Sequence, residues 1–208
     1  MLEEVLDKWR RGQTGPLPHL TPLQLLNALL LIDQDAPVGR RAMAQALEIN
    51  DGLARGLFER LGEQGIVIVE KTGVRLSPQG KTRLHKLLTE MSILRIQPLD
   101  ESNLVPGKLA TAIHLTGKYR VGMTGIPQRD EAIKSGAHGS IIIGVLGGKL
   151  VIPPDNRDAA ELSPGEDKRL RDLFDLSEND LIVIGFANSR TRSQSGALAA
   201  ALSISKRS

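Results

Sequence analysis

Six side chains between residues 40 and 75 have the chemistry needed to bind a nucleic acid. Arginine and lysine neutralise phosphate oxygens, and an arginine on a helix can also donate two hydrogen bonds to one guanine. The stretch 38–86 has nine basic and five acidic residues, a modest local excess of positive charge. It therefore predicts phosphate binding, and the candidate DNA-binding residues are Arg40, Arg41, Asn50, Arg55, Lys71 and Arg75.

The residues around these candidates predict the elements that position them. Residues 40–47 form a short amphipathic helix, residues 48–51 a turn that Asn50 or Asp51 can cap, and residues 52–64 a second helix with a leucine stripe. Residues 66–70 and 74–76 are rich in β-branched side chains and predict a two-stranded ribbon. Helix, turn, helix and ribbon make a winged helix, whose second helix enters the major groove.

The expected winged helix gives the five basic candidates their roles in DNA binding. Arg55 lies opposite the leucine stripe, so we expect it to face the bases. Arg40 and Arg41 begin the preceding helix, which crosses the backbone, and Lys71 and Arg75 lie at the ribbon. All four are expected to contact phosphates. The alternative is that these residues are only solvated charges.

The second half of the chain contains a weaker candidate site. Arg129 follows a glycine at one strand-to-helix junction, and Asn188, Ser189 and Arg190 follow a strongly apolar strand at another. Such junctions present free backbone amides to anions, and open α/β sheets bind ligands at the carboxyl ends of their strands. The four residues could therefore hold a phosphate or a carboxylate. Alternatively, the glycines only form turns, and Asn188 or Ser189 caps the last helix.

Other chemistry is not supported by the residue types. Cysteine is absent, and the four histidines do not cluster or show metal-ligand spacing. We therefore expect no metal and no cofactor, and no nucleophile or paired-carboxylate pattern indicates an enzyme. With five aromatic residues in the chain, stacking of single-stranded bases is not expected either.

Two domains are expected along the 208 residues. Residues 1–92 form the winged helix-turn-helix domain, with an N-terminal helix over 2–11, a core helix over 22–32 and a linking helix through about residue 91. Residues 93–107 form a linker. Residues 108–208 form a small C-terminal α/β domain, with strands over 109–115, 119–124, 140–146, 149–152 and 180–186. The fold class is therefore mixed, α+β or α/β.

Several motifs resemble those of a known group of proteins. The segments VGRRAMAQALEIN and LFERLGEQGIVIVEKTGVRLSPQGK look like the winged-helix head of archaeal regulators. Combined with QRDEAIKSGAHGSIIIGVLGGKLVIP and DLIVIGFANSR, they are similar to an uncharacterised archaeal family of winged-helix proteins. The resemblance implies DNA binding by the head and no particular reaction for the rest. Asp51 and Gly52 depart from the usual Ser or Thr at the start of the recognition helix.

The function predicted from these observations is that of a DNA-binding transcriptional regulator. It would bind double-stranded DNA as a homodimer, and its C-terminal domain would dimerise or sense a small anionic effector. The alternative is a small-molecule-binding or enzymatic α/β protein whose winged helix is a structural or protein-interaction module. The sequence contains no apolar run long enough to span a membrane and no signal-peptide pattern, which favours a cytoplasmic protein.

Overall fold

The computed structural model of the protein describes residues 20–99 and 102–205, which divide between Leu87 and Leu88 into two units. The expected mixed class is confirmed, with a helical first unit and a second unit built on a six-stranded sheet. The helix expected over residues 2–11 lies outside the described residues. Within the described ranges, no helix is long and apolar enough to cross a membrane.

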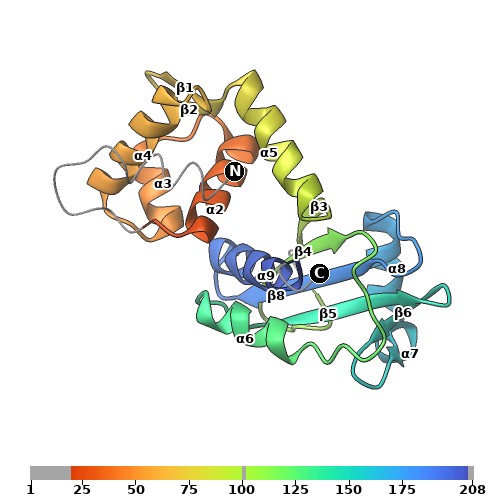
Figure 1. The fold of residues 1–208 in the computed structure, drawn as a ribbon. Helices are drawn as coiled ribbons and strands as arrows, with labels where there is room; N and C mark the ends of the chain where they lie inside the picture. The colour runs from red at the N-terminus through yellow and green to blue at the C-terminus, as the bar shows by residue number, and fades with distance from the viewer. Residues whose placement is uncertain (1–19, 100–101, 206–208) are drawn as a thin grey trace. The chain divides into compact units, whose positions relative to one another are not determined.

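The first unit follows the order of a winged helix (Figure 1). Thr21 caps helix α2 (Pro22–Asp35): its hydroxyl accepts a hydrogen bond from the Gln24 amide at 3.1 Å, and its own amide donates one to Gln24 Oε1 at 3.0 Å. Asn50 caps the recognition helix by accepting from the Leu53 amide at 2.8 Å. The elements are α2 (Pro22–Asp35), α3 (Arg40–Leu47), α4 (Asp51–Glu63), β1 (Val67–Glu70), β2 (Gly73–Leu76) and α5 (Pro78–Glu90).

The core of the first unit is formed by the apolar stripes that the sequence predicts. Helix α2 is buried along most of its length, which explains why it is apolar nearly all round. One face of α4 packs in this core through Leu57, Phe58 and Leu61. One face of α3 packs there through Met43. The opposite face of α4 is thereby left open to solvent.

The ribbon is joined to the start of α3 by a contact that the sequence does not predict. Strands β1 and β2 pair antiparallel, with Glu70 opposite Gly73. Val38 pairs with Val74 through two backbone hydrogen bonds of 2.9 Å, just before α3 begins. Gly73 has φ of +149°, and a Cβ there would lie 2.4 Å from the Val38 oxygen. The glycine therefore permits the close approach that holds the ribbon beside α3.

Ser77 ties the ribbon to α5. Its hydroxyl accepts a hydrogen bond from the Gly80 amide at 2.9 Å and donates one to the Gly65 carbonyl. Because Ser77→Ala removes both hydrogen bonds, we expect it to lower the unfolding free energy of the first unit by about 1–2 kcal/mol. Urea denaturation measures this change. Thr82→Ala is the control, since Thr82 is exposed on the same helix. Equal effects of the two substitutions would contradict the capping role.

The second unit is a six-stranded sheet in the order β3-β4-β8-β5-β6-β7, with every neighbouring pair antiparallel. The apolar run ending in Phe186 forms the central strand, as expected. The two-glycine hairpin between β5 and β6 is also present. The elements are β3 (Ile93–Leu99), β4 (Leu109–Leu115), α6 (Ile126–Lys134), β5 (Gly139–Leu146), β6 (Lys149–Ile152), β7 (Arg157–Asp158), α7 (Ala159–Leu162), α8 (Pro164–Leu173), β8 (Leu181–Ala187) and α9 (Arg190–Ser205).

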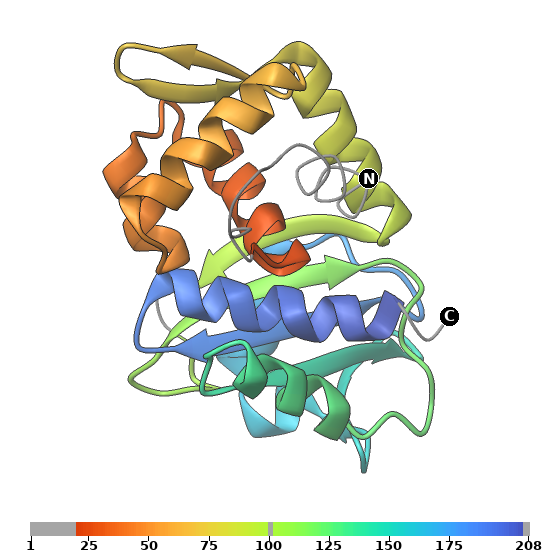
Figure 2. The same cartoon turned by 60° about the vertical axis from the view of Figure 1, so that its left-hand side comes forward.

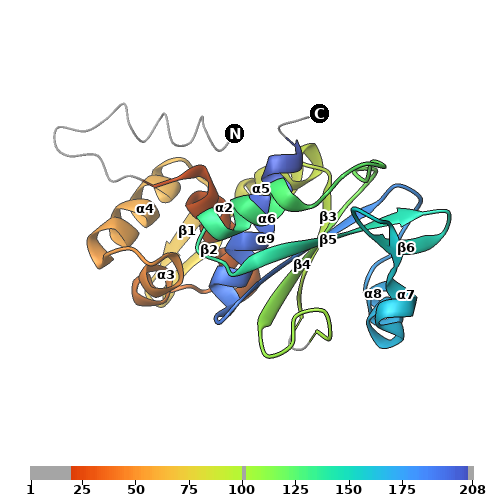
Figure 3. The ribbon, with the colours of Figure 1, turned by 90° about the horizontal axis from the view of Figure 1, so that it is seen from below.

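Helices cover both faces of this sheet. On one face α9 runs along β8 and β4 with α6 beside it (Figure 2). There Gly185 lets α9 approach, because a Cβ at Gly185 would lie 2.3 Å from the Ala197 nitrogen. The other face buries a core that includes Leu170 and Phe174, around the end of α8, which lies beside α7 (Figure 3).

Two expectations for this half were wrong. The linker predicted over 93–107 is in part β3, an edge strand that pairs with β4 along its length. Pro98 made the segment look like a loop, but an edge strand tolerates a proline. Residues 119–124 do not form a strand. Gly117 and Gly122 adopt positive φ and turn the chain, while the buried Tyr119 ring packs on Gly144.

A buried carboxylate joins β4, β8 and the loop after β4. Asp180 Oδ2 lies 2.8 Å from His114 Nε2 and accepts from the Ser177 amide at 2.9 Å, while Oδ1 accepts from the Gly117 amide at 2.8 Å. Burial alone would raise the pKa of Asp180. The hydrogen bonds from the two backbone amides and His114 outweigh it, so the pKa lies below its ordinary value of 3.8.

Candidate nucleic-acid interface

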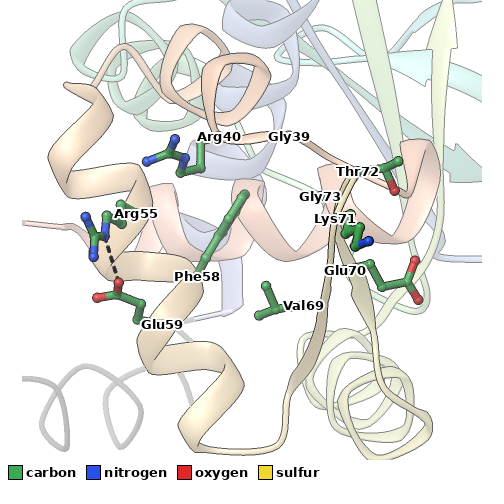
Figure 4. A pocket seen from close by; sticks show the side chains of 10 residues that line it. All are labelled: Gly39, Arg40, Arg55, Phe58, Glu59, Val69, Glu70, Lys71, Thr72 and Gly73. Atoms are coloured by element: carbon green, nitrogen blue, oxygen red, sulfur yellow. Dashed lines mark hydrogen bonds and ion pairs between the residues drawn. The ribbon is translucent and has the colours of Figure 1, made fainter.

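The first unit contains a groove between the recognition helix α4 and the ribbon. It has a volume of about 320 Å³. We call it the helix–ribbon groove and define it by its lining residues, which come from the start of α3, the exposed face of α4 and the ribbon (Figure 4). They are Gly39, Arg40, Arg55, Phe58, Glu59, Val69, Glu70, Lys71, Thr72 and Gly73.

Three of the six predicted DNA-binding side chains line this groove. Arg40 and Arg55 lie on its helix side, and Lys71 lies on its ribbon side (Figure 4). All three are exposed. They come from three separate segments, and the Val38–Val74 pairing brings the ribbon segment beside the start of α3. The groove is therefore open to solvent, with at least one basic side chain on each side beside Glu59 on the helix and Glu70 on the ribbon.

Carboxylates already pair with the two arginines of the groove. Arg55 Nε donates to Glu59 Oε1 at 2.8 Å, and Arg40 Nη1 lies 3.5 Å from Asp51 Oδ2. The hydrogen bond to Glu59 and its negative charge raise the pKa of Arg55, which therefore stays charged. Exposed pairs of this kind are weak. A phosphate can therefore replace the carboxylate as the partner of either guanidinium.

The other three predicted residues lie outside the groove lining. Asn50 uses its side-chain oxygen to cap α4, as the sequence allowed. Arg75 donates to Glu70 across the ribbon. Arg41 is exposed on α3, and it has no carboxylate within ion-pair distance in the part of the chain that the structure describes.

The apolar part of the groove was missed by sequence reasoning. The spacing of Phe58 places it on the apolar stripe of α4, yet it also lines the groove between helix and ribbon (Figure 4). Val69 lies next to it and is 61% exposed. An exposed valine on a short strand has no periodic signal that separates it from a core residue, so only the fold reveals this surface.

The anion site predicted in the second unit is not assembled in one place. Arg129 lies on α6, pairs with Asp130 at 3.1 Å and lines a cavity of about 210 Å³ that includes none of the other three residues. Asn188 accepts a hydrogen bond from Lys108 at 2.7 Å, and Ser189 accepts one from the Arg192 amide at 3.3 Å. Arg190 begins α9. The rule for parallel strand ends does not apply, because the sheet is antiparallel.

Among the described residues, no group of three or more histidine, aspartate or glutamate side chains could hold a metal ion.

Comparisons with known proteins give different matches for the two halves of the chain. Residues 25–91 match the family model of the CggR N-terminal DNA-binding domain, and residues 106–204 match that of a domain of unknown function, DUF4443. No curated protein matches the chain. A solved structure of a hypothetical protein from Pyrococcus horikoshii OT3 is similar, with a TM-score of 0.73 and 25% identity, over 91% of this chain and 95% of that one. The first half of the chain is therefore similar to a DNA-binding domain of the CggR type, and the second half is similar to DUF4443.

Proposed function

We propose that the protein is a cytoplasmic, dimeric transcriptional regulator that grips double-stranded DNA in the helix–ribbon groove. The observation that carries the proposal is the meeting of Arg40, Arg55 and Lys71 in one solvent-open groove of a domain of DNA-binding type. Helix α4 would enter the major groove with Arg55 toward the bases, and the ribbon would lie along the backbone. The sugar–phosphate strand between them would pass through the helix–ribbon groove.

The start of α3 supports this mode of binding. Gly39 precedes α3, lines the groove and provides no side-chain cap for the helix. The first amides of α3 therefore have no side-chain cap, and helix N-termini of this kind bind anions. Arg40 and Lys71 would neutralise the same stretch of backbone. Arg41, Asn50 and Arg75 flank the groove and would contact phosphates next to it.

The C-terminal domain would couple two such heads. In this proposal it dimerises the chain or senses a small anionic effector, so that two recognition helices reach successive half-sites of a palindrome. A regulator of this kind requires the effector to favour one dimer geometry over the other.

The test is the binding of the full chain to fluorescent genomic duplexes across a series of salt concentrations. If Arg40, Arg41, Lys71 and Arg75 each neutralise one phosphate in both heads, the logarithm of affinity should fall with the logarithm of salt with a slope of about −7. Arg55→Ala should reduce the preference for specific over random duplex by about tenfold, because one bidentate arginine–guanine contact is lost.

Lys81→Ala is the matched control, since Lys81 is an exposed basic residue of the same unit and does not line the groove. The proposal fails if no genomic duplex is bound more tightly than random DNA. It also fails if Lys81→Ala reduces the preference for specific over random duplex as much as Arg55→Ala does.

A further inference from the structure

The second unit contains a larger cavity that the sequence did not indicate. It has a volume of about 560 Å³ and lies between the loop 118–124, the start of α6 and the end of α9. We call it the α6–α9 cavity. Its size is typical of a small-molecule site. Its lining includes Lys118, Arg120, Met123, Thr124, Gln128 and Ile204.

Arg120 is held in place with part of its guanidinium unused. Its Nη1 donates to the carbonyls of Gly117 at 2.8 Å and Tyr119 at 2.7 Å. Its Nε and Nη2, which form the opposite edge of the group, make no hydrogen bond to any described residue. That edge is the one that binds the two oxygens of a carboxylate or a phosphate. The loop therefore presents an arginine that is already oriented.

Gln128 provides a second and independent observation. The residue is only 5% exposed and lines the cavity, yet its side-chain amide makes no hydrogen bond within the described part of the chain. The fully buried side-chain atoms without a partner among the described residues belong to Ser140, Glu166 and Asp167, so the amide atoms of Gln128 keep contact with solvent. A ligand that occupied the cavity would replace that solvent as the hydrogen-bonding partner of Gln128.

The remaining lining defines the kind of molecule that fits. Lys118 adds a second positive charge, and no acidic side chain is among the lining residues. Met123, Pro127 and Ile204 provide apolar surface. Thr124 adds a hydroxyl. The complementary molecule has an anionic group for Arg120, a hydrogen-bonding group for Gln128 and a short aliphatic part.

We propose that the α6–α9 cavity binds a small organic anion, with Arg120 holding its anionic group and Gln128 hydrogen-bonding to it. The site differs from the one predicted from the sequence, because Arg129 and residues 188–190 do not line it. The proposal rests on the ligand-sensing part of the function proposed above. It does not depend on DNA binding, and its test contains no DNA.

The experiment titrates the full chain with glutarate, glycerol 3-phosphate and inorganic phosphate, using calorimetry and the NMR shifts of amides 117–125. Glutaramide has the skeleton of glutarate without its charge and is the negative control. We expect saturable binding of glutarate or glycerol 3-phosphate, and no binding of glutaramide. Preference for one of the two distinguishes a carboxylate site from a phosphate site.

Variants then locate the site. Arg120→Gln should weaken binding about tenfold or more, because a charged hydrogen-bonding partner is lost. Gln128→Met preserves the length of the side chain and should weaken binding severalfold. Arg129→Gln, one residue further along α6 and outside the cavity, should leave binding unchanged.

Three results would overturn the proposal. They are the absence of saturable binding of any probe at millimolar concentration, unchanged binding by Arg120→Gln, and loss of binding in Arg129→Gln alone. Each leaves the DNA-binding measurements above unaffected, so the two proposals fail separately.

Discussion

Replacing Arg40, Arg55 and Lys71 together with glutamine is expected to weaken binding to specific DNA by about a thousandfold or more. Each substitution removes a charged hydrogen-bonding group from the helix–ribbon groove, and such groups contribute about 1.5 kcal/mol or more each. The loss should be smallest at high salt. Removal of the phosphate contacts of Arg40 and Lys71 should also make the slope of log affinity against log salt shallower by about 2 per head. Fluorescence anisotropy across a salt series measures both effects.

A second triple variant separates the groove from net charge. Lys81→Gln, Arg157→Gln and Lys168→Gln remove the same charge from exposed positions outside the groove. We expect this variant to lose little affinity, because none of the three residues lines the groove. If both triple variants weaken binding equally, DNA is attracted by overall charge and the groove is not its site.

Removal of the Asp180 carboxylate is expected to destabilise the second unit by about 3–5 kcal/mol. Asp180→Ala would leave the buried His114 side chain and the backbone amides of Gly117 and Ser177 without their shared acceptor. Urea denaturation measures the effect. Asp155→Ala is the control, since Asp155 is exposed and no described residue pairs with it. A loss of less than about 1 kcal/mol would mean that water or a shift of the loop replaces the carboxylate.

The same carboxylate gives this destabilisation a pH dependence. Because the folded pKa of Asp180 lies below its ordinary value of 3.8, the folded state binds its proton less readily than the unfolded state. The stabilisation is therefore present above pH 3.8 and is lost as the pH falls through the folded pKa. The difference in unfolding free energy between the native protein and Asp180→Ala should thus become smaller in acid. A difference that grows in acid would contradict the lowered pKa.

The first unit could be predicted from sequence because its signals are local. The spacing of Leu57 and Leu61 and the caps at Thr21 and Asn50 act within one or two helical turns. The Val38–Val74 pairing could not be predicted, since a single bridged residue has no period.

The candidate sites show the same contrast between local and tertiary signals. Arg55 was found from its helical face. Phe58 was not recognised as a groove residue, because its spacing fits the core equally well. In the second unit, Arg120 and Gln128 are separated by a loop with two glycines of positive φ, and only tertiary structure brings them to one cavity. Edge strand β3 was missed because Pro98 and the exposed Arg95 resemble loop residues.

The place of β8 in the sheet has a consequence for how the protein is made. Strands β4 and β5 do not pair with each other, and each pairs with β8, which follows both in the chain. As the ribosome releases the chain, the β3–β4 and β5–β6 hairpins emerge as separate pieces with unfilled apolar faces. They can become one sheet only after residues 181–187 have left the exit tunnel. The winged helix is complete by then, so the nascent chain can acquire its DNA-binding head before its second unit exists.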